Sequence, residues 1–236
     1  QILNARGGIE SDITVQRHGR ETYLLIVGAG EIVRDMKRLR ETKADFRVGL
    51  TDVTSGYAIL GLAGAQAQAV LQKASSAKVP QIGRFRFAPV EVGLARGWVG
   101  RLSFTGEAGF ELYIPSDMAM AAYEALIAAG ATHAGLFASG SLRIESGFRA
   151  WGHEMSPGVT PFEAGTETFV AWNTDFVGKD ALLQVRDTPP SRRIVSLLFE
   201  DPAAIPIHDE PIWRNGQAVG QITSAAWSYR FGRSVA

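Results

Sequence analysis

The sequence predicts an α+β fold built mostly from antiparallel sheet. Residues 84–114 run as successive β segments broken by Gly and Pro, which is the pattern of neighbouring antiparallel strands. After Pro189-Pro190 the helical periodicity ends and the chain reads as β throughout. Strands and helices elsewhere alternate too irregularly for a doubly wound parallel sheet. We therefore expect helices packed on antiparallel strands, and a domain boundary near residues 189–191.

The individual elements follow from hydrophobic periodicity and from turn signals. Ser116 is the expected N-cap of a helix that Gly130 ends. Asn215-Gly216 predicts a two-residue hairpin turn. The expected elements are, in chain order, strands at 8–15 and 23–27, a helix at 31–40, a strand at 57–62, helices at 64–73, 116–129, 136–146 and 178–185, and strands at 194–199 and 218–223.

Composition excludes several classes of function. The 236 residues are 46% hydrophobic, which is enough for a sizeable buried core. Lys+Arg and Asp+Glu each number 24, so the chain lacks the basic excess typical of proteins that bind nucleic acid or anionic membranes. Arg34 to Arg40 is the densest basic cluster, and its helical spacing favours a solvated helix face. No apolar stretch reaches the ~18 residues of a membrane span.

Cysteine is absent, which excludes disulfides, thiolate metal sites and cysteine nucleophiles. The four histidines are far apart in the sequence, so we expect no metal site. A chain without cysteine suits a reducing compartment. It opens on Gln1 and ends at Ala236 where a strand begins, so we expect it to be cut at both ends.

Residues 23–35 imitate the start of a dinucleotide-binding fold, with an apolar strand, Gly28-Ala29-Gly30 and then a helix. The fingerprint needs a third small residue for close packing, and that position holds Val33. Asp52, at the expected acidic position, lies in a Thr/Ser turn. We interpret this segment as a strand-to-helix turn.

The first candidate site segment is residues 3–15, where Gly7-Gly8 leads into a strand. On such a strand Asp12 and Thr14 would share one face, where a carboxylate and a hydroxyl can contact a ligand together. A turn-capping Asp beside a surface Thr fits the same residues equally well. Both interpretations stay open at this point.

The second segment, residues 103–112, has two glycines that let a loop approach a ligand closely, and Glu111 opens the strand that follows. A buried carboxylate can accept two parallel N–H bonds from an amidine-like edge, such as the amino-pyrimidinone edge of a pterin. The alternative is a pair of surface acids flanking a hairpin.

The third segment, residues 140–154, carries Arg143 on a helix and Arg149 on the loop after it. These guanidinium groups could bind carboxylates of a ligand, or pair internally with Glu145 and Glu154, which is the common outcome. Residues 160–165, TPFEAG, read as a rigid turn after this loop.

Three stretches, GGIESDITV, SFTGEAGFEL and RIESGFRAWGHEMSPGVTPFEAG, occur in an order and spacing that resemble the folate-binding domain of the glycine-cleavage T-protein superfamily. The form RAWGHE…TPFEAG most resembles the folate domains fused to flavin enzymes, namely sarcosine oxidase, sarcosine dehydrogenase and dimethylglycine oxidase or dehydrogenase. The resemblance covers nearly the whole chain.

This resemblance implies roles for five residues. Asp12 would be the catalytic acid beside the reacting folate nitrogen, and Thr14 would line the same pocket. Glu111 would hold the pterin edge. Phe104 stands where relatives often carry a Tyr, so stacking survives but a hydroxyl is lost. Arg143 matches a helix arginine of the family that contacts the cofactor.

The resemblance also implies a three-part ring with a small C-terminal β-barrel. One part would combine residues 1–56 and 137–188 as a discontinuous folate-binding subdomain. Residues 57–136 would form a second α+β subdomain, and residues 191–236 an incomplete barrel.

The implied function is tetrahydrofolate-dependent one-carbon transfer, which captures an iminium or aminomethyl carbon from sarcosine, dimethylglycine or a similar methylated amine as 5,10-methylenetetrahydrofolate. FAD would belong to a partner domain or subunit outside this chain. The protein itself would be cytoplasmic in a bacterium, or lie in the mitochondrial matrix in a eukaryote. The alternatives are a stand-alone aminomethyltransferase of the glycine cleavage system, a methyl-transferring demethylase on the same scaffold, and a non-catalytic folate-binding module.

Overall fold

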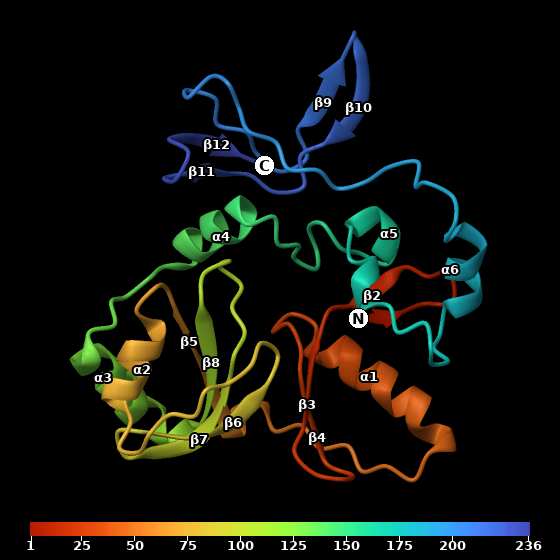
Figure 1. Cartoon of the computed structure of the whole chain (residues 1–236). Helices are drawn as coiled ribbons and strands as arrows, with labels where there is room; N and C mark the ends of the chain where they lie inside the picture. The colour runs from red at the N-terminus through yellow and green to blue at the C-terminus, as the bar shows by residue number, and fades with distance from the viewer. The chain divides into compact units, whose positions relative to one another are not determined.

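The computed structural model describes the backbone of residues 1–236 and every side chain except that of Asp45 (Figure 1). The chain forms two compact units. The first unit combines Gln1–Leu50 with Arg149–Ala236, and the second is the continuous segment Thr51–Phe148. Helices and antiparallel strands occur in both units, so the predicted α+β class is confirmed.

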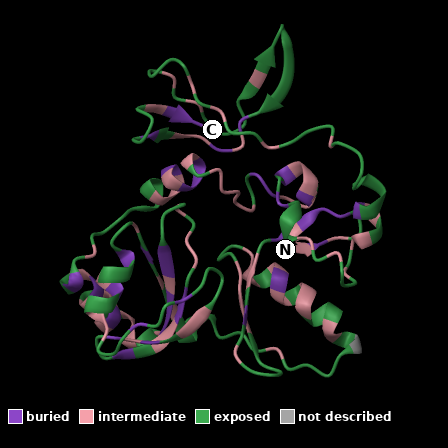
Figure 2. Ribbon diagram, in the orientation of Figure 1, coloured by how far each residue is buried: buried purple, intermediate pink, exposed green. Residues whose placement is uncertain are grey.

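The second unit is built on a four-stranded antiparallel sheet with the strand order β5-β8-β7-β6. Successive side chains along each strand point to opposite faces of the sheet. The apolar side chains of one face pack against two helices and form a single hydrophobic core. Figure 2 shows this core as buried stretches of the central strands. The elements are β5 (Tyr57–Ala63), α2 (Ala67–Ala74), β6 (Phe87–Val92), β7 (Ala95–Gly100), β8 (Gly109–Pro115) and α3 (Ala119–Ala129), with the 3-10 helices η2 (Thr54–Gly56) and η3 (Ser116–Met118).

The helix predicted between Ser116 and Gly130 ends at the expected residue but does not begin there. Gly130 ends α3 with φ of 111°, in the left-handed region that glycine adopts without strain. Ser116 is not the N-cap as expected, because its hydroxyl donates to the carbonyl of Ser55 and the first turn is the 3-10 helix η3. A further helix, α4 (Leu136–Glu145), ends just before Gly147, whose φ is 66°.

The first unit holds small two-stranded sheets around a separate apolar core. The core joins the N-terminal strands to the loops and helices after residue 149, with Ile9, Met155 and Leu182 fully or almost fully buried. The elements are β1 (Ile2–Leu3), β2 (Ile9–Ser11), β3 (Thr14–Arg17), β4 (Tyr23–Ile26), α1 (Ile32–Thr42), α5 (Pro161–Ala164) and α6 (Lys179–Val185), with the 3-10 helices η1 (Lys43–Asp45) and η4 (Glu167–Phe169).

The single strand expected at residues 8–15 is wrong. The chain forms β2 and β3 instead, with Asp12 and Ile13 between them. The break arises because the chain changes partner: β2 pairs with β1, whereas β3 pairs with β4. Asp12 therefore lies in a two-residue connection and does not share a strand face with Thr14.

The C-terminal part of the first unit consists of two antiparallel hairpins, β9 (Pro211–Arg214) with β10 (Gln217–Gln221), and β11 (Ala226–Ser228) with β12 (Arg233–Val235). The predicted turn at Asn215-Gly216 is confirmed, with φ of 53° and 75° at its two residues. The strand expected at 194–199 is present only as an isolated bridge between Leu198 and Val235. No closed barrel forms among the described residues.

No helix in the described part of the chain combines the length and apolar character needed to cross a membrane. The described side chains also contain no cluster of three His, Asp or Glu residues that could hold a metal ion.

Candidate functional site

Asp12 lies directly after β2, with part of its side chain open to solvent. Protein atoms packed around its carboxylate remove part of its hydration, and this desolvation raises the pKa of Asp12 above its usual value. The positive charge of the N-terminus and a hydrogen bond with the Gln1 side chain act in the opposite direction but do not cancel the effect. A carboxylate in such a setting can accept a proton or stabilise a nearby cation.

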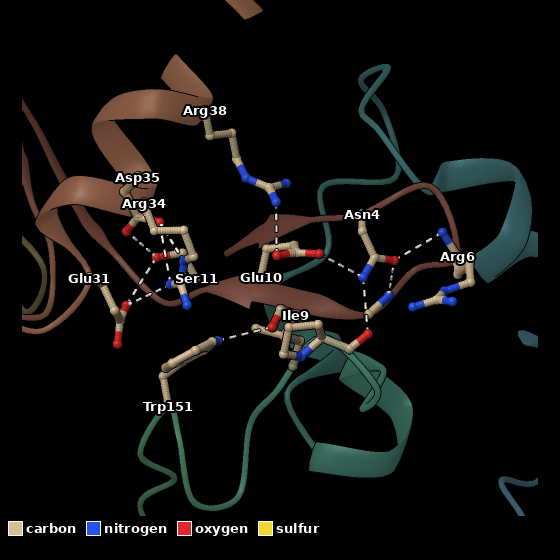
Figure 3. Close-up of polar contacts among 12 residues, drawn as sticks. Asn4, Arg6, Ile9, Glu10, Ser11, Glu31, Arg34, Asp35, Arg38 and Trp151 are labelled. Atoms are coloured by element: carbon tan, nitrogen blue, oxygen red, sulfur yellow. Dashed lines mark hydrogen bonds and ion pairs between the residues drawn. The ribbon is translucent and has the colours of Figure 1, made fainter. Parts of the chain in front are cut away.

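Helix α1 fixes the strand residue next to Asp12. The Ser11 hydroxyl, which is fully buried, donates to Asp35 Oδ2 at 2.5 Å and lies 3.2 Å from Glu31 Oε2 (Figure 3). Asp35 is itself only 1% exposed. Arg34 binds both acids, with contacts of 3.3 Å to each carboxylate. This charged network attaches the end of β2 to the first turns of α1.

The loop after residue 149 attaches the same strand from another direction. Trp151 Nε1 donates to the Ile9 carbonyl at 3.0 Å, and the Arg34 guanidinium lies over the Trp151 ring (Figure 3). The first and third sequence motifs thus meet in the first unit through a hydrogen bond between residues 142 positions apart. Sequence reasoning missed this contact, and no local pattern predicts it.

The solvated face expected for Arg34 to Arg40 is therefore wrong in part. Lys37 is largely exposed, but Arg38 binds Glu10 at 2.8 Å, and both Arg34 and Arg38 keep only about a third of their side-chain surface in solvent. Because α1 packs beside β2, its basic residues meet the acids of that strand and of the helix itself.

The paired glycines before β2 are required by backbone contacts. A Cβ on Gly8 would collide with the Pro157 carbonyl oxygen, and Gly7 has φ of 81°. Asn4 fixes the turn: its Oδ1 accepts from the backbone N–H groups of Arg6 and Gly8, and its Nδ2 donates to Glu10 and to the Pro157 carbonyl (Figure 3).

The rigid turn predicted at TPFEAG is present as α5 with a complete capping box. Thr160 accepts from the Glu163 N–H, while the Glu163 carboxylate accepts from the Thr160 N–H at 2.7 Å. Burial alone would raise the pKa of Glu163, but hydrogen bonds from Arg192 and Thr160 outweigh it and lower that pKa. The Arg192 contact, 2.7 Å long, links this turn to the chain after the predicted boundary.

Glu111 lies in the middle of β8 and is half-buried. Tyr113, two residues further along the same strand face, donates its hydroxyl to Glu111 Oε2 at 2.6 Å. Desolvation raises the pKa of Glu111 and the Tyr113 hydrogen bond partly opposes it. The i, i+2 spacing of the two residues is a sequence signal that could have identified Tyr113 as the partner.

Phe104 and Arg143 meet at Phe148 in the same unit. The Phe104 and Phe148 rings stack with centroids 6.2 Å apart, and Phe104 is 44% exposed. Arg143 is only 7% exposed and donates to the Phe148 carbonyl at 3.2 Å. Arg143 thus supports this loop, and its contact with a cofactor stays a prediction.

Glycine also fixes the loop of the second motif. A Cβ on Gly106 would collide with the Ser146 side chain, whose hydroxyl donates to the Thr105 carbonyl at 3.2 Å. The five predicted site residues therefore fall into two groups. Asp12 and Thr14 belong to the first unit, and Phe104, Glu111 and Arg143 to the second.

Residues 1–174 match the GCVT N-terminal domain, and residues 192–236 match the glycine cleavage T-protein C-terminal barrel domain. The chain is 35% identical to human mitochondrial dimethylglycine dehydrogenase over 246 residues, which cover 100% of this chain and 28% of that protein. It is 33% identical to an aminomethyltransferase of Thermoanaerobacter pseudethanolicus, with coverage of 96% and 63%.

The solved structure of the glycine cleavage system aminomethyltransferase T from Bartonella henselae is similar in fold. Its TM-score is 0.86 at 28% identity, over 99% of this chain and 64% of that one. The chain thus spans less than a third of the dehydrogenase and less than two thirds of the aminomethyltransferases.

Proposed function

This chain belongs to the glycine cleavage T-protein family, and we propose that it binds tetrahydrofolate and transfers a one-carbon unit to it. The donor is an iminium or aminomethyl species derived from sarcosine, dimethylglycine or a similar methylated amine, and the product is 5,10-methylenetetrahydrofolate. Tetrahydrofolate supplies the nucleophilic nitrogen. The protein has to position the reactants and manage charge.

The observation that carries this proposal is the state of Glu111. Its carboxylate is desolvated, and Tyr113 occupies one site on Oε2, so Oε1 and the remaining lone pair of Oε2 can accept two parallel N–H bonds. The amino-pyrimidinone edge of a pterin offers that pair of donors. The residues present therefore fit a reduced folate.

In this proposal Asp12 and Thr14 contact the part of the folate that carries the reacting nitrogen. Asp12, next to the fixed residue Ser11, stabilises the cationic electrophile or accepts the proton released on ring closure. Thr14 lines the pocket beside it. Phe104 contacts the cofactor through its ring, and Arg143 contributes from helix α4, where it also supports the loop at Phe148.

We propose that the donor is made by an FAD-containing domain or subunit outside this chain. The support is that the similarity to dimethylglycine dehydrogenase covers 100% of this chain. A stand-alone aminomethyltransferase is the second candidate, because the similarity to the aminomethyltransferase of Thermoanaerobacter covers 96% of the chain. The domain division that we propose is a folate-binding subdomain of residues 1–56 and 137–188, a second subdomain of residues 57–136, and an incomplete β-barrel of residues 191–236.

Calorimetry with tetrahydrofolate on the full chain tests the proposal, with folinic acid as competitor. We expect saturable heat that folinic acid displaces, and a loss of binding free energy of roughly 1–3 kcal/mol in Glu111→Gln, the effect of unpairing a buried charged hydrogen bond. No heat and no competition would contradict folate binding. Unchanged affinity in Glu111→Gln would show that the Glu111 carboxylate does not bind the folate.

A further inference from the structure

Both cross-strand neighbours of Glu111 are glycines. In the sheet of the second unit, Glu111 on β8 is paired with Gly61 on β5 at one side and with Gly100 on β7 at the other. Residues directly opposite in an antiparallel sheet project from the same face, with Cβ atoms about 5 Å apart. The Glu111 side chain therefore stands on its face without a side chain at either flanking position.

Gly61 belongs to the face of β5 that turns away from the helices. Along this strand Ile59, Gly61 and Ala63 are exposed, whereas Leu60 and Leu62 pack in the core with α2 and α3. A Cβ built at Gly61 would meet no heavy atom of the described residues within 4 Å. The backbone of Gly61 lies outside the left-handed region.

Folding therefore gives no reason for glycine at position 61. Glycine in the middle of a strand is destabilising, because it loses more backbone entropy than other residues and has no side chain to pack. A β-branched residue would suit the position better, since the strand is regular and the space is open. A glycine that the fold does not need, next to a desolvated carboxylate, points to a ligand that uses the space.

We propose that Gly61 is a specificity-determining residue, which leaves room beside Glu111 for the flat ring of a reduced pterin while the ring edge donates to the Glu111 carboxylate. The inference rests on the proposed function and adds the surface against which the ring lies. A planar ring fits over a strand position that lacks a side chain. A Val side chain at that position would occupy the same volume and keep the ring from Glu111.

The test is a graded substitution with two readouts, tetrahydrofolate affinity and thermal unfolding of the full chain. Gly61→Val should raise the Kd for tetrahydrofolate roughly tenfold or more, as overpacking of a fitted site does, and Gly61→Ala should raise it less. The Tm should stay equal or rise in both variants, because strand propensity improves. Opposite signs for affinity and stability distinguish an obstructed site from a damaged fold.

Gly56→Val is the matched control. Gly56 lies just before β5, is exposed, has no left-handed φ, and a Cβ there would also meet no described heavy atom within 4 Å. Its Kd should equal that of the wild type. Equal affinity of Gly61→Val and wild type, or an equal loss in Gly56→Val, overturns the inference.

A double-mutant cycle with Glu111→Gln shows whether both residues act on one ring. If the Gly61→Val side chain displaces the ring from Glu111, the double variant should lose little more affinity than Gly61→Val alone. Strictly additive losses contradict the inference. If the wild type does not bind tetrahydrofolate, the proposed function fails and this inference fails with it. If the wild type binds and Gly61→Val binds equally well, only the role of Gly61 fails.

Discussion

The Arg34 guanidinium carbon lies 3.9 Å from the centroid of the Trp151 ring. This contact joins helix α1 to the loop after residue 149, and the indole N–H reaches the Ile9 carbonyl on β2 at 3.0 Å. Trp151 therefore contacts a cation with its ring face and a backbone acceptor with its ring edge. The strand that precedes Asp12 is fixed between these two elements.

Trp151→Phe should destabilise the protein by about 1–2 kcal/mol. The ring remains, but the Ile9 carbonyl loses a donor, and the cation–π attraction is weaker for Phe than for Trp. Chemical denaturation measures the change in the free energy of unfolding. Trp213→Phe is the control, because Trp213 is 64% exposed on β9. An equal effect of the two substitutions would contradict the role given to the Trp151 N–H.

Asp35→Ala should cost roughly 1–3 kcal/mol of folding free energy. It removes the main acceptor of the buried Ser11 hydroxyl and one of the two acids that bind Arg34. Glu41→Ala on the same helix is the control, since Glu41 forms an exposed ion pair with Lys37 at 3.8 Å, and such pairs contribute roughly 0–1 kcal/mol. If Asp35→Ala unfolds no more easily than Glu41→Ala, the Ser11–Asp35 network does not stabilise β2.

Sequence reasoning predicted best those elements that local backbone chemistry decides. Gly130 and the Asn215-Gly216 turn adopt positive φ where the sequence indicated a stop and a hairpin. The split of the 8–15 strand could not be predicted, because it depends on which strand lies beside each half. Ser116 failed as a cap for a similar reason, since its hydroxyl finds a carbonyl 61 residues away.

For the candidate site, the sequence identified candidate residues better than the neighbouring residues that hold them in place. Glu111 lies on β8, as its position after a glycine loop suggested, and it is half-buried, which the sequence had left open. The residues that fix β2, namely Arg34, Asp35 and Trp151, come from distant segments, and no local pattern indicated their contacts with this strand. The sequence also did not indicate Gly61 as a site residue, because only the strand register places it opposite Glu111.

The contribution of Glu163 to stability should depend on pH. Its folded-state pKa is lowered, so the folded protein binds a proton at this carboxylate less readily than the unfolded chain does. Its stabilising effect is therefore present above the ordinary pKa of a glutamate, about 4.3, and is lost as the pH falls through the lower folded value. The difference in Tm between wild type and Glu163→Gln should shrink as the pH falls from 7 to 3.

Arg192→Met should reduce the same pH dependence, because it removes the hydrogen-bond partner that does most to lower the pKa of Glu163. A Tm difference between wild type and Glu163→Gln that stays constant across this pH range would show that the capping box and the Arg192 contact do not depend on the charge of Glu163.

Asp12→Ala should lower the rate of methylenetetrahydrofolate formation by a factor of roughly 100 or more, the scale of acid–base and charge-stabilising effects. Folate affinity should change much less, because an interaction made mainly in the transition state affects the rate and not ground-state binding. Asp12→Asn should behave like Asp12→Ala, since the amide keeps the shape but neither accepts the proton nor carries the charge. Single-turnover product formation and a binding titration measure the two quantities.

The pH profile separates this chemical role from a structural one. The pKa of Asp12 is raised mainly by desolvation, and the active form is the carboxylate, so the wild-type rate should fall as the pH falls through that raised pKa. Asp12→Asn should lack this limb, whereas Asp187→Asn, an exposed acid of the same unit, should keep both the limb and the full rate. Equal losses of affinity and rate in Asp12→Ala would make Asp12 a binding residue. No loss of either would favour a non-catalytic folate-binding module, because the only acid assigned to the reacting end would then be dispensable.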